Sequence, residues 1–418
     1  MIQTNTNSLP VILGGKPIRT KPWGSYPKIM GNELGYVQQV LTSDQWFNGS
    51  VTRRFEQALA DYLKVPHAVA VNTGGIALQI ALRCLGLRPG DEVLMQIDTC
   101  AADAFAVFHA GLVPIFADSD PKSYSLDWKS AEETVGVRTR AIIPVHIWGR
   151  PEEMDKVLEF AQRHHLLVLD DACLAMGAEW RSRRTGTFGE AGVFSFGSLK
   201  PFQAGGGAAI VTGDADLARE LRVSRSWGEM QEEYGIRDQR ELAWNGRIPE
   251  IVSAVLCAQL EGYNAHLALL QENAALLESM IADFPGIRLL DKDDRITAQA
   301  YTQFRFNLDE AELVSTRNAF AQALQAEGLP LVWHGAFEPI TTLSFFRESR
   351  WRTWADGYPD PARLVENYNR SYPGSEFGFE HVGMSIGRNV LLCGREGLQD
   401  AAQIIERICL NAARLSGS

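Results

Sequence analysis

The segment VFSFGSLKPFQAGGG, residues 193–207, places Lys200 between a buried apolar run and a glycine-rich turn. The run at 193–196 is typical of a strand inside a parallel sheet, and Lys200 follows its end. Upstream, a second apolar run at 166–169 is followed by the acid pair Asp170 and Asp171. Open α/β sheets hold their ligands just beyond the carboxyl ends of the strands. The sequence therefore indicates a site that contains an amine and a carboxylate.

Lys200 and Asp171 suit the chemistry of an aldehyde cofactor. Pyridoxal 5'-phosphate (PLP) needs a lysine amine to form a Schiff base and a carboxylate to keep its ring nitrogen protonated. A lysine in a glycine-rich turn is by itself usually a solvated residue, because lysine is rarely buried without a partner. The assignment therefore depends on the rest of the chain.

The arrangement of apolar runs predicts an α/β fold. Between about residues 35 and 225, β-branched runs alternate with helical patterns, which is typical of a mainly parallel sheet between two layers of helices. The expected strands are 68–71, 92–96, 113–117, 141–145, 166–169, 193–196 and 208–211. After Pro249 the pattern changes to one long amphipathic helix at 251–281. The further elements expected are a strand at 301–306 and helices at 310–327 and 398–410.

A chain of 418 residues with 45% apolar content is long enough for more than one core. The change of pattern predicts three parts: an N-terminal segment 1–35, a large PLP-binding domain 36–260 and a smaller C-terminal α+β domain 261–418. The tryptophan-rich stretch 333–354 falls in the smaller domain, where Trp351 and Trp354 are expected to pack rather than to bind a ligand.

Charge and cysteine usage exclude several classes of protein. The net charge of -11 is spread along the chain without a basic run, which disfavours nucleic acid and anionic membranes as partners. The six cysteines form no CxxC pair, so neither a zinc site nor a disulfide framework is expected. No targeting segment and no apolar stretch of about 18 residues is present. These features favour a cytoplasmic protein.

The first predicted strand leads into paired glycines, Gly74 and Gly75, at the start of a helical pattern. Glycines at a helix N-terminus let backbone N–H groups approach a phosphate closely. The sequence is neither GxGxxG nor a Walker loop, so a dinucleotide or nucleoside triphosphate is not indicated. A simple turn would explain the pair equally well.

Taken together, five segments resemble the DegT/StrS family of PLP-dependent sugar aminotransferases, which has the fold-type I architecture. They are residues 74–78, 91–93, 139–146, 168–177 and 193–207, and the resemblance covers most of the chain. Two N-terminal motifs, LGGKPIR at 13–19 and LTSDQW at 41–46, resemble the branch that contains aminocyclitol aminotransferases and aminohydroxybenzoate synthases.

The resemblance implies a role for individual residues. Lys200 would form the Schiff base and shuttle protons, and Asp171 would face the pyridine nitrogen. Ser195 and the amides of Gly74 and Gly75 would bind the phosphate. Asn245 resembles an asparagine that reaches the phosphate from a neighbouring subunit, which implies a homodimer with active sites at its interface.

Five positions depart from the family pattern. Gly75 stands where threonine is usual, Cys100 replaces a ring that stacks on the pyridine, and Leu174 replaces a glutamine or histidine near the phenolic oxygen. Gly206 replaces a glutamate, and Trp227 stands where histidine is common. Each lost stacking contact or hydrogen bond is worth roughly 1 kcal/mol of cofactor binding. The departures are compatible with looser PLP retention or with a changed reaction.

Two residues are candidates for contact with substrate. His334 lies in a segment that resembles a substrate-facing part of the family's small domain, although a core or surface histidine would fit equally well. Arg247 could bind a carboxylate or phosphate through its forked guanidinium, or it could form a structural ion pair. His164 and His165 are expected at a helix end, where histidine complements the helix dipole.

The principal hypothesis is an aminotransferase that moves an amino group from glutamate or glutamine to a keto-sugar or keto-cyclitol, in amino-sugar or secondary-metabolite biosynthesis. An alternative keeps PLP but dehydrates, aromatises or oxidises a sugar or carbocycle. A second alternative is a sensory or structural protein that has lost catalysis. A metal enzyme built on Asp170 and Asp171 is disfavoured, because adjacent strand residues point to opposite faces.

Overall fold

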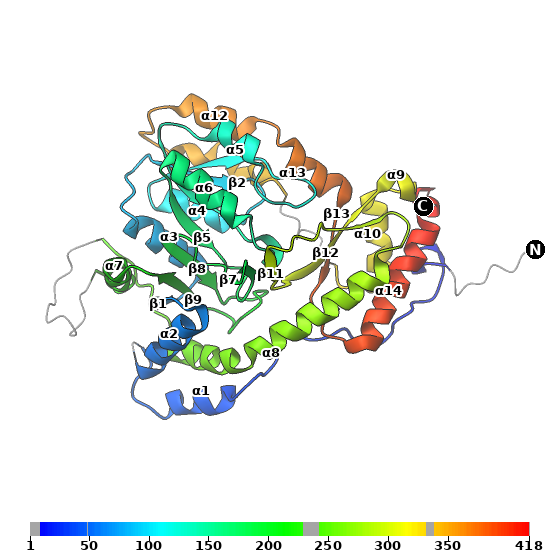
Figure 1. Cartoon of the computed structure of the whole chain (residues 1–418), viewed down its shortest axis with the longest axis horizontal. Coiled ribbons are helices and arrows are strands. Elements are labelled where there is room, and N and C mark those ends of the chain that lie inside the picture. Colours follow the sequence, from blue (N-terminus) through cyan, green and yellow to red (C-terminus); the bar gives the residue numbers. More distant parts are fainter. Residues whose placement is uncertain (1–8, 48, 229–241, 332–337, 418) are drawn as a thin grey trace, which may run out of the picture.

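The computed structural model describes residues 9–47, 49–228, 242–331 and 338–417 of the chain (Figure 1). A helix-covered sheet forms one end of the molecule, and a smaller sheet with its own helices forms the other. The long helix α8 (Glu250–Ile281) runs between the two ends (Figure 1). No helix of the described residues is long and apolar enough to cross a membrane.

The larger sheet has seven strands in the order β1-β9-β8-β5-β4-β2-β3. Their bounds are β1 (His67–Val71), β2 (Glu92–Gln96), β3 (Val113–Ala117), β4 (Thr139–Ile143), β5 (Leu167–Asp171), β8 (Ala191–Ser195) and β9 (Ala208–Thr212). Only β9 runs antiparallel to its neighbours in this sheet, and the other pairs are parallel. The prediction of an α/β fold with a mainly parallel sheet is confirmed.

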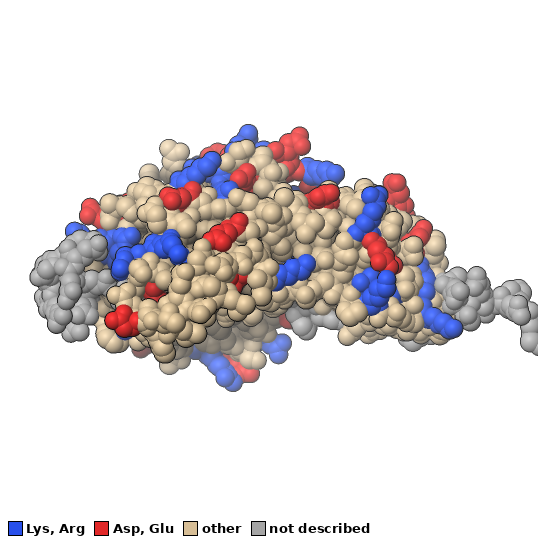
Figure 2. All heavy atoms as spheres, turned by 90° about the horizontal axis from the view of Figure 1, so that it is seen from below, with Lys and Arg blue, Asp and Glu red and all other residues tan. Residues whose placement is uncertain are grey.

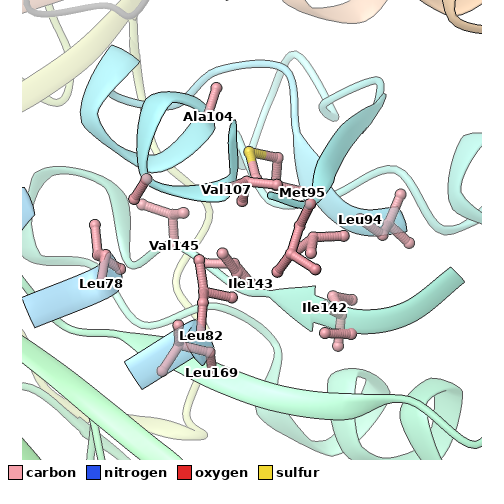
Figure 3. Close-up of a cluster of buried hydrophobic side chains, with 14 of the residues drawn as sticks. Leu78, Leu82, Leu94, Met95, Ala104, Val107, Ile142, Ile143, Val145 and Leu169 are labelled. Carbon is pink, nitrogen blue, oxygen red and sulfur yellow. The ribbon is translucent and has the colours of Figure 1, made fainter. Parts of the chain in front are cut away.

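Helices bury both faces of this sheet, which explains why its strands are almost continuously apolar. These helices are α2 (Ser50–Leu63), α3 (Gly74–Cys84), α4 (Ala101–His109), α5 (Trp128–Thr134), α6 (Met154–His164) and α7 (Ala215–Arg225). In Figure 3, Leu78 and Leu82 of α3, one turn apart, lie on the same core as Ala104 and Val107 of α4. As expected, His164 and His165 stand at the end of α6.

The smaller sheet is antiparallel, in the order β10 (Ile287–Leu289), β12 (Gln303–Leu308), β13 (Gly383–Gly387). Its apolar face packs on α8, α10 (Arg317–Ala326) and α14 (Gly394–Asn411). The single helix expected at 310–327 is two, α9 (Glu310–Leu313) and α10. Val314 adopts a left-handed conformation at the break, and the Thr316 side chain then caps α10 by accepting a hydrogen bond from the Ala319 amide.

Residues 338–377 do not pack where the tryptophan-rich stretch was expected. This segment comprises η5 (Ile340–Thr342), α11 (Ser344–Arg347), η6 (Arg350–Thr353), α12 (Pro361–Asn369) and α13 (Pro373–Phe377). Phe346 and the buried Trp351 join the core of the larger sheet, and the Phe346 ring lies 5.5 Å from that of Phe116 on β3. Trp351 is core, as expected, but of the other sheet. Apolar spacing predicts burial without identifying the partner. The boundaries at 35 and 260 remain predictions.

A third, short sheet joins β6 (Glu179–Trp180), β7 (Arg183–Arg184) and β11 (Ile296–Ala298). It links the segment after β5 to the segment before β12. Two further hydrogen bonds act at the same junction: the Ala300 amide donates to the Gly149 carbonyl, and the Thr302 hydroxyl donates to the Leu174 carbonyl. The smaller sheet is therefore held against the carboxyl ends of β4 and β5, where a site is expected.

Candidate active site

Lys200 and Asp171 lie at the carboxyl ends of two adjacent parallel strands. Asp171 ends β5 and pairs in register with Val193 of β8, whereas Lys200 stands in the turn that follows β8. Both charges act on the thiol of Cys173. Burial raises the pKa of that thiol, the Asp171 carboxylate raises it further, and the Lys200 ammonium opposes the rise. The amine and the carboxylate predicted from the sequence therefore belong to one cluster.

Asp170 and Asp171 are both buried, but they face opposite sides of the sheet. The Asp171 Oδ1 accepts a hydrogen bond of 2.9 Å from the Cys173 amide. Asp170 Oδ1 lies 2.7 Å from His146 Nε2, and its Oδ2 accepts from the Phe188 amide at 3.1 Å. The part of the chain that the structure describes contains no group of three acidic, histidine or cysteine side chains able to hold a metal ion. The structure thus offers no support for a metal site at this acid pair.

The glycine at the start of α3 permits a close contact that a larger residue would block. A Cβ atom on Gly74 would lie 2.9 Å from the Ser195 Cβ and 3.0 Å from its Oγ, which is too close for an unstrained contact. The Ser195 hydroxyl is therefore held beside the first turn of α3, where backbone N–H groups have no partner within the helix. The Ile76 amide donates to the Thr73 hydroxyl, and a helix N-terminus of this kind, with a hydroxyl beside it, is where proteins commonly bind an anion such as a phosphate. We refer to this place as the anion cradle.

Gly75 differs from Gly74, because a Cβ atom there would meet no other atom within 4 Å. A Cβ atom at Gly206 would likewise meet none, so the two small residues leave open space at these positions. Two other departures, Cys100 and Leu174, lie near Asp171. Cys100 is the N-cap of α4. Burial raises the pKa of its thiol, the Asp171 carboxylate also raises it, and the Lys200 ammonium lowers it. Leu174 is half-buried, in the loop just after Asp171.

The turn that carries Lys200, which we call the lysine turn, is held by hydrogen bonds from two residues that the sequence did not identify. Arg388, which follows β13, donates from Nη1 to the Lys200 carbonyl at 2.8 Å and from Nη2 to the Leu199 carbonyl. Its guanidinium lies 4.4 Å from the ring centre of Tyr26, whose hydroxyl donates to the Pro201 carbonyl. The turn therefore depends on the smaller sheet and the N-terminal segment.

A third acid, Asp103, was also missed. It is the third residue of α4, is 1% exposed, and accepts a hydrogen bond from the Thr99 hydroxyl. Burial raises the pKa of its carboxyl group, the nearby Asp171 carboxylate raises it further, and the Lys200 ammonium opposes the rise. The available signal was an acid within the otherwise apolar helical run AADAFAVFHAG, residues 101–111.

The structure does not place Asn245 or Arg247 in this cluster. Arg247 donates to the Asn245 Oδ1 from Nη2 at 3.0 Å, and its guanidinium lies 4.3 Å from the ring centre of Trp227. Asn245 is exposed. The neighbouring Gly246 carbonyl accepts from the Asn72 amide, which sets this segment beside the end of β1. The contact of Asn245 with another subunit stays a prediction, and His334 lies outside the described residues.

Comparison with known proteins agrees with this geometry. Residues 27–356 match the model of the DegT/DnrJ/EryC1/StrS aminotransferase family. The chain is 32% identical to a putative L-glutamine:3-amino-2,3-dideoxy-scyllo-inosose aminotransferase of Streptoalloteichus tenebrarius, over 84% of this chain and 86% of that protein. It is 35% identical to the GDP-perosamine synthase of Caulobacter vibrioides, over 72% of this chain and 81% of that protein.

A solved structure has the same fold. The crystal structure of 3-amino-5-hydroxybenzoic acid synthase superimposes with a TM-score of 0.80 and 27% identity, over 94% of this chain and 98% of that one. The expected fold-type I architecture is therefore confirmed, together with the expectation of an aminotransferase. On its sequence, its fold and the grouping of Lys200 with Asp171, the chain belongs to the DegT/DnrJ/EryC1/StrS aminotransferase family.

Proposed function

We propose that this aminotransferase binds PLP and transfers an amino group from glutamine or glutamate to the ketone of a cyclitol or sugar. One observation carries the proposal: an amine, a buried carboxylate and an anion cradle meet at the same edge of one sheet. These are the three groups that the aldehyde, the ring nitrogen and the phosphate of PLP require.

Each part of the site has a separate task. When bound, PLP supplies an electron sink for the negative charge that develops on the substrate carbon. The Ser195 hydroxyl and the N-terminal amides of α3 would bind the phosphate, and Asp171 would hold the proton on the ring nitrogen. The Lys200 Nζ would take a proton from the substrate carbon and return it to the neighbouring position, as a general base and then a general acid.

The names of the relatives support the choice of substrates. The Streptoalloteichus relative is named for L-glutamine and an inosose, and the Caulobacter relative is named a synthase of the amino sugar nucleotide GDP-perosamine. A keto-cyclitol and a keto-sugar present the same reacting group, a ring ketone. We therefore propose glutamine or glutamate as the donor and a ring ketone as the acceptor, with small molecules as the only substrates.

The surface is compatible with a homodimer. Trp46, Phe47 and Trp227 are roughly half exposed, although apolar side chains of this size are usually covered. The face seen from below in Figure 2, which includes α8 and α1 (Glu33–Leu41), has broad areas without charged residues. A second copy would cover such surfaces. The six cysteines are all unpaired, which fits the reducing cytoplasm.

The test is spectroscopic. Purified protein is titrated with PLP, and the visible absorption band of the bound cofactor is followed after addition of L-glutamine or L-glutamate. Loss of that band, with release of the matching keto acid, is the expected result. A keto-cyclitol and a keto-sugar nucleotide are then offered, and mass spectrometry detects the amine in the product. Lys200→Ala should show no conversion. A wild-type protein that binds PLP but is discharged by neither donor would contradict the proposal.

A further inference from the structure

The lysine turn contains a residue in an unfavourable backbone conformation. Leu199 has a φ of 70°, in the left-handed region, where a residue with a Cβ atom is uncommon. The other positive-φ positions of this turn are glycines, Gly205 and Gly207, which adopt such angles without a steric penalty. The Leu199 side chain is 78% exposed in the single chain, so packing within the chain does not stabilise it. The conformation must therefore be held through the backbone.

Arg388 supplies the contacts that hold this backbone. Its Nη2 donates to the Leu199 carbonyl and its Nη1 donates to the Lys200 carbonyl at 2.8 Å, so one rigid guanidinium binds two successive carbonyl groups. The Lys200 amide donates to the Gly197 carbonyl at 3.3 Å. The peptide that joins Leu199 to Lys200 therefore cannot rotate without breaking at least one hydrogen bond.

Arg388 is 5% exposed, and carbonyl groups and aromatic rings rather than an acid surround its charge. The Tyr26 ring lies 4.4 Å from the guanidinium and is stacked on the ring of His266 in α8, with ring centres 5.3 Å apart. Burial lowers the pKa of the guanidinium, and among the described residues Tyr26 and Tyr263 oppose that fall. A buried charge without an opposite charge costs free energy. The fold nevertheless directs this arginine at the two carbonyls beside the lysine amine.

We propose that Arg388 is a positioning residue for Lys200. By holding the two carbonyls, it keeps the lysine turn in its left-handed conformation and fixes the direction in which the Lys200 side chain leaves the backbone. This inference rests on the proposed function, in which the Lys200 Nζ bonds to the cofactor and moves a proton. The turn follows β8 of the larger sheet, and Arg388 follows β13 of the smaller one (Figure 1). The position of the amine therefore depends on the contact between the two sheets.

Two substitutions at Arg388 test the role of its donors. Arg388→Met keeps an apolar stem but has no donor, so both carbonyls lose their partner. A displaced catalytic amine weakens the transition state more than it weakens substrate binding. We therefore expect kcat to fall about a hundredfold, while the KM of the amino donor stays within about threefold of wild type. Arg388→Lys keeps the charge and can donate to one carbonyl at a time, so its kcat should lie between those of Arg388→Met and wild type.

A second measurement needs no cofactor and no turnover. Amide hydrogen exchange is followed in protein free of PLP, over residues 197–204. In Arg388→Met these amides should exchange about tenfold faster than in wild type, because the bonds from a charged donor to the turn are lost. Circular dichroism and thermal melting verify that each variant folds, and Arg388→Lys carries the same test if Arg388→Met does not fold.

The matched control is Arg317→Met. Arg317 is also buried, at 7% exposure, and its Nε donates to the Gly383 carbonyl at 2.7 Å, at the opposite end of β13 from Arg388. This variant should keep the exchange rate of the lysine turn and the kcat per folded molecule. Unchanged exchange or unchanged kcat in Arg388→Met, or equal effects of Arg317→Met, would overturn the inference. Failure of the wild type to bind PLP would instead overturn the proposed function, and the exchange rates would still report whether Arg388 holds the turn.

Discussion

The two sides of the sheet at the end of β5 use neighbouring aspartates in opposite ways. On one side, both side-chain oxygens of Asp170 have hydrogen-bond partners, His146 Nε2 and the Phe188 amide. His146 Nδ1 accepts from the Glu152 amide at 2.8 Å, so the proton lies on Nε2 and is donated to Asp170. On the other side, Asp171 accepts a hydrogen bond from the Cys173 amide; burial and the Asp171 carboxylate raise the pKa of the Asp103 carboxyl group, and the Lys200 ammonium opposes that rise. Both side-chain oxygens of Asp170 therefore have partners within the fold, whereas Asp171 is the carboxylate that we propose for the cofactor.

The difference shows that burial alone does not identify a functional acid. Asp170 is fully buried and Asp171 nearly so, and they are adjacent in the sequence. The two aspartates differ in the groups that lie beside them. A neutral imidazole and an amide satisfy both oxygens of Asp170, whereas a lysine and a second buried acid lie on the Asp171 side, which is the kind of environment found at functional sites.

The largest effect is expected for Asp171→Ala. Removing one partner of a buried charge pair costs about 3–5 kcal/mol, which corresponds to a loss of roughly a hundredfold or more in kcat/KM. The visible band of bound PLP should also change, because the ring nitrogen loses its partner. Steady-state kinetics and absorption spectra measure both effects. Turnover close to wild type would remove Asp171 from the catalytic site.

Asp170→Asn should lower the stability of the protein and leave its activity nearly unchanged. An amide has one acceptor oxygen where the carboxylate has two, so either the His146 Nε2–H or the Phe188 amide would face an N–H group. Leaving a buried donor unsatisfied lowers the free energy of unfolding by about 1–3 kcal/mol. Urea denaturation measures this loss, while kcat per folded molecule should remain near wild type. A large fall in kcat without loss of stability would place Asp170 in the chemistry and break the comparison.

The smallest effect concerns the anion cradle on the Asp171 side. Gly74→Ala would bring a Cβ atom to 2.9 Å from the Ser195 Cβ, so one of the two elements must shift. We expect a loss of about 1 kcal/mol in PLP binding, or roughly fivefold in affinity. Gly75→Ala is the matched variant, because its Cβ would meet no atom within 4 Å, and it should lose less. Equilibrium titration with PLP compares the two. Equal affinities would show that the Gly74–Ser195 contact does not shape the cradle.

The strands of the larger sheet were predictable because they are buried on both faces. The expected bounds of β2 and β3 coincide with the observed ones, and the other expected strands in this sheet differ by one or two residues. Continuous apolar runs mark such strands clearly. The helix at 310–327 was overestimated, since the left-handed turn at Val314 interrupts a pattern that remains apolar across the break. The short strands of the third sheet were missed because two or three residues are too few to show a hydrophobic pattern.

Part of the site was predictable by the same logic. Lys200 and Asp171 follow recognisable strands, so the general rule for α/β sheets indicated their common edge, and the role of Ser195 came from the resemblance to the family. Asp103, Arg388 and Tyr26 were not predicted, because their roles depend on contacts between distant segments. Arg388, for example, reaches the Lys200 carbonyl across 188 positions of sequence. A single sequence contains no pattern that records such a contact.

The sequence by itself determined the parallel sheet and the strand-end positions of Lys200 and Asp171, because hydrophobic periodicity and strand ends are local properties of the chain. It also determined that Asp170 and Asp171 face opposite sides, since strand side chains alternate. Only the tertiary structure showed that both side-chain oxygens of Asp170 have partners within the protein. That finding left Asp171 as the proposed ligand of the cofactor. The packing of α4, His146 and the turn that carries Lys200 around β5 sets the partners of each carboxyl group, and these partners depend on distances in space rather than along the chain.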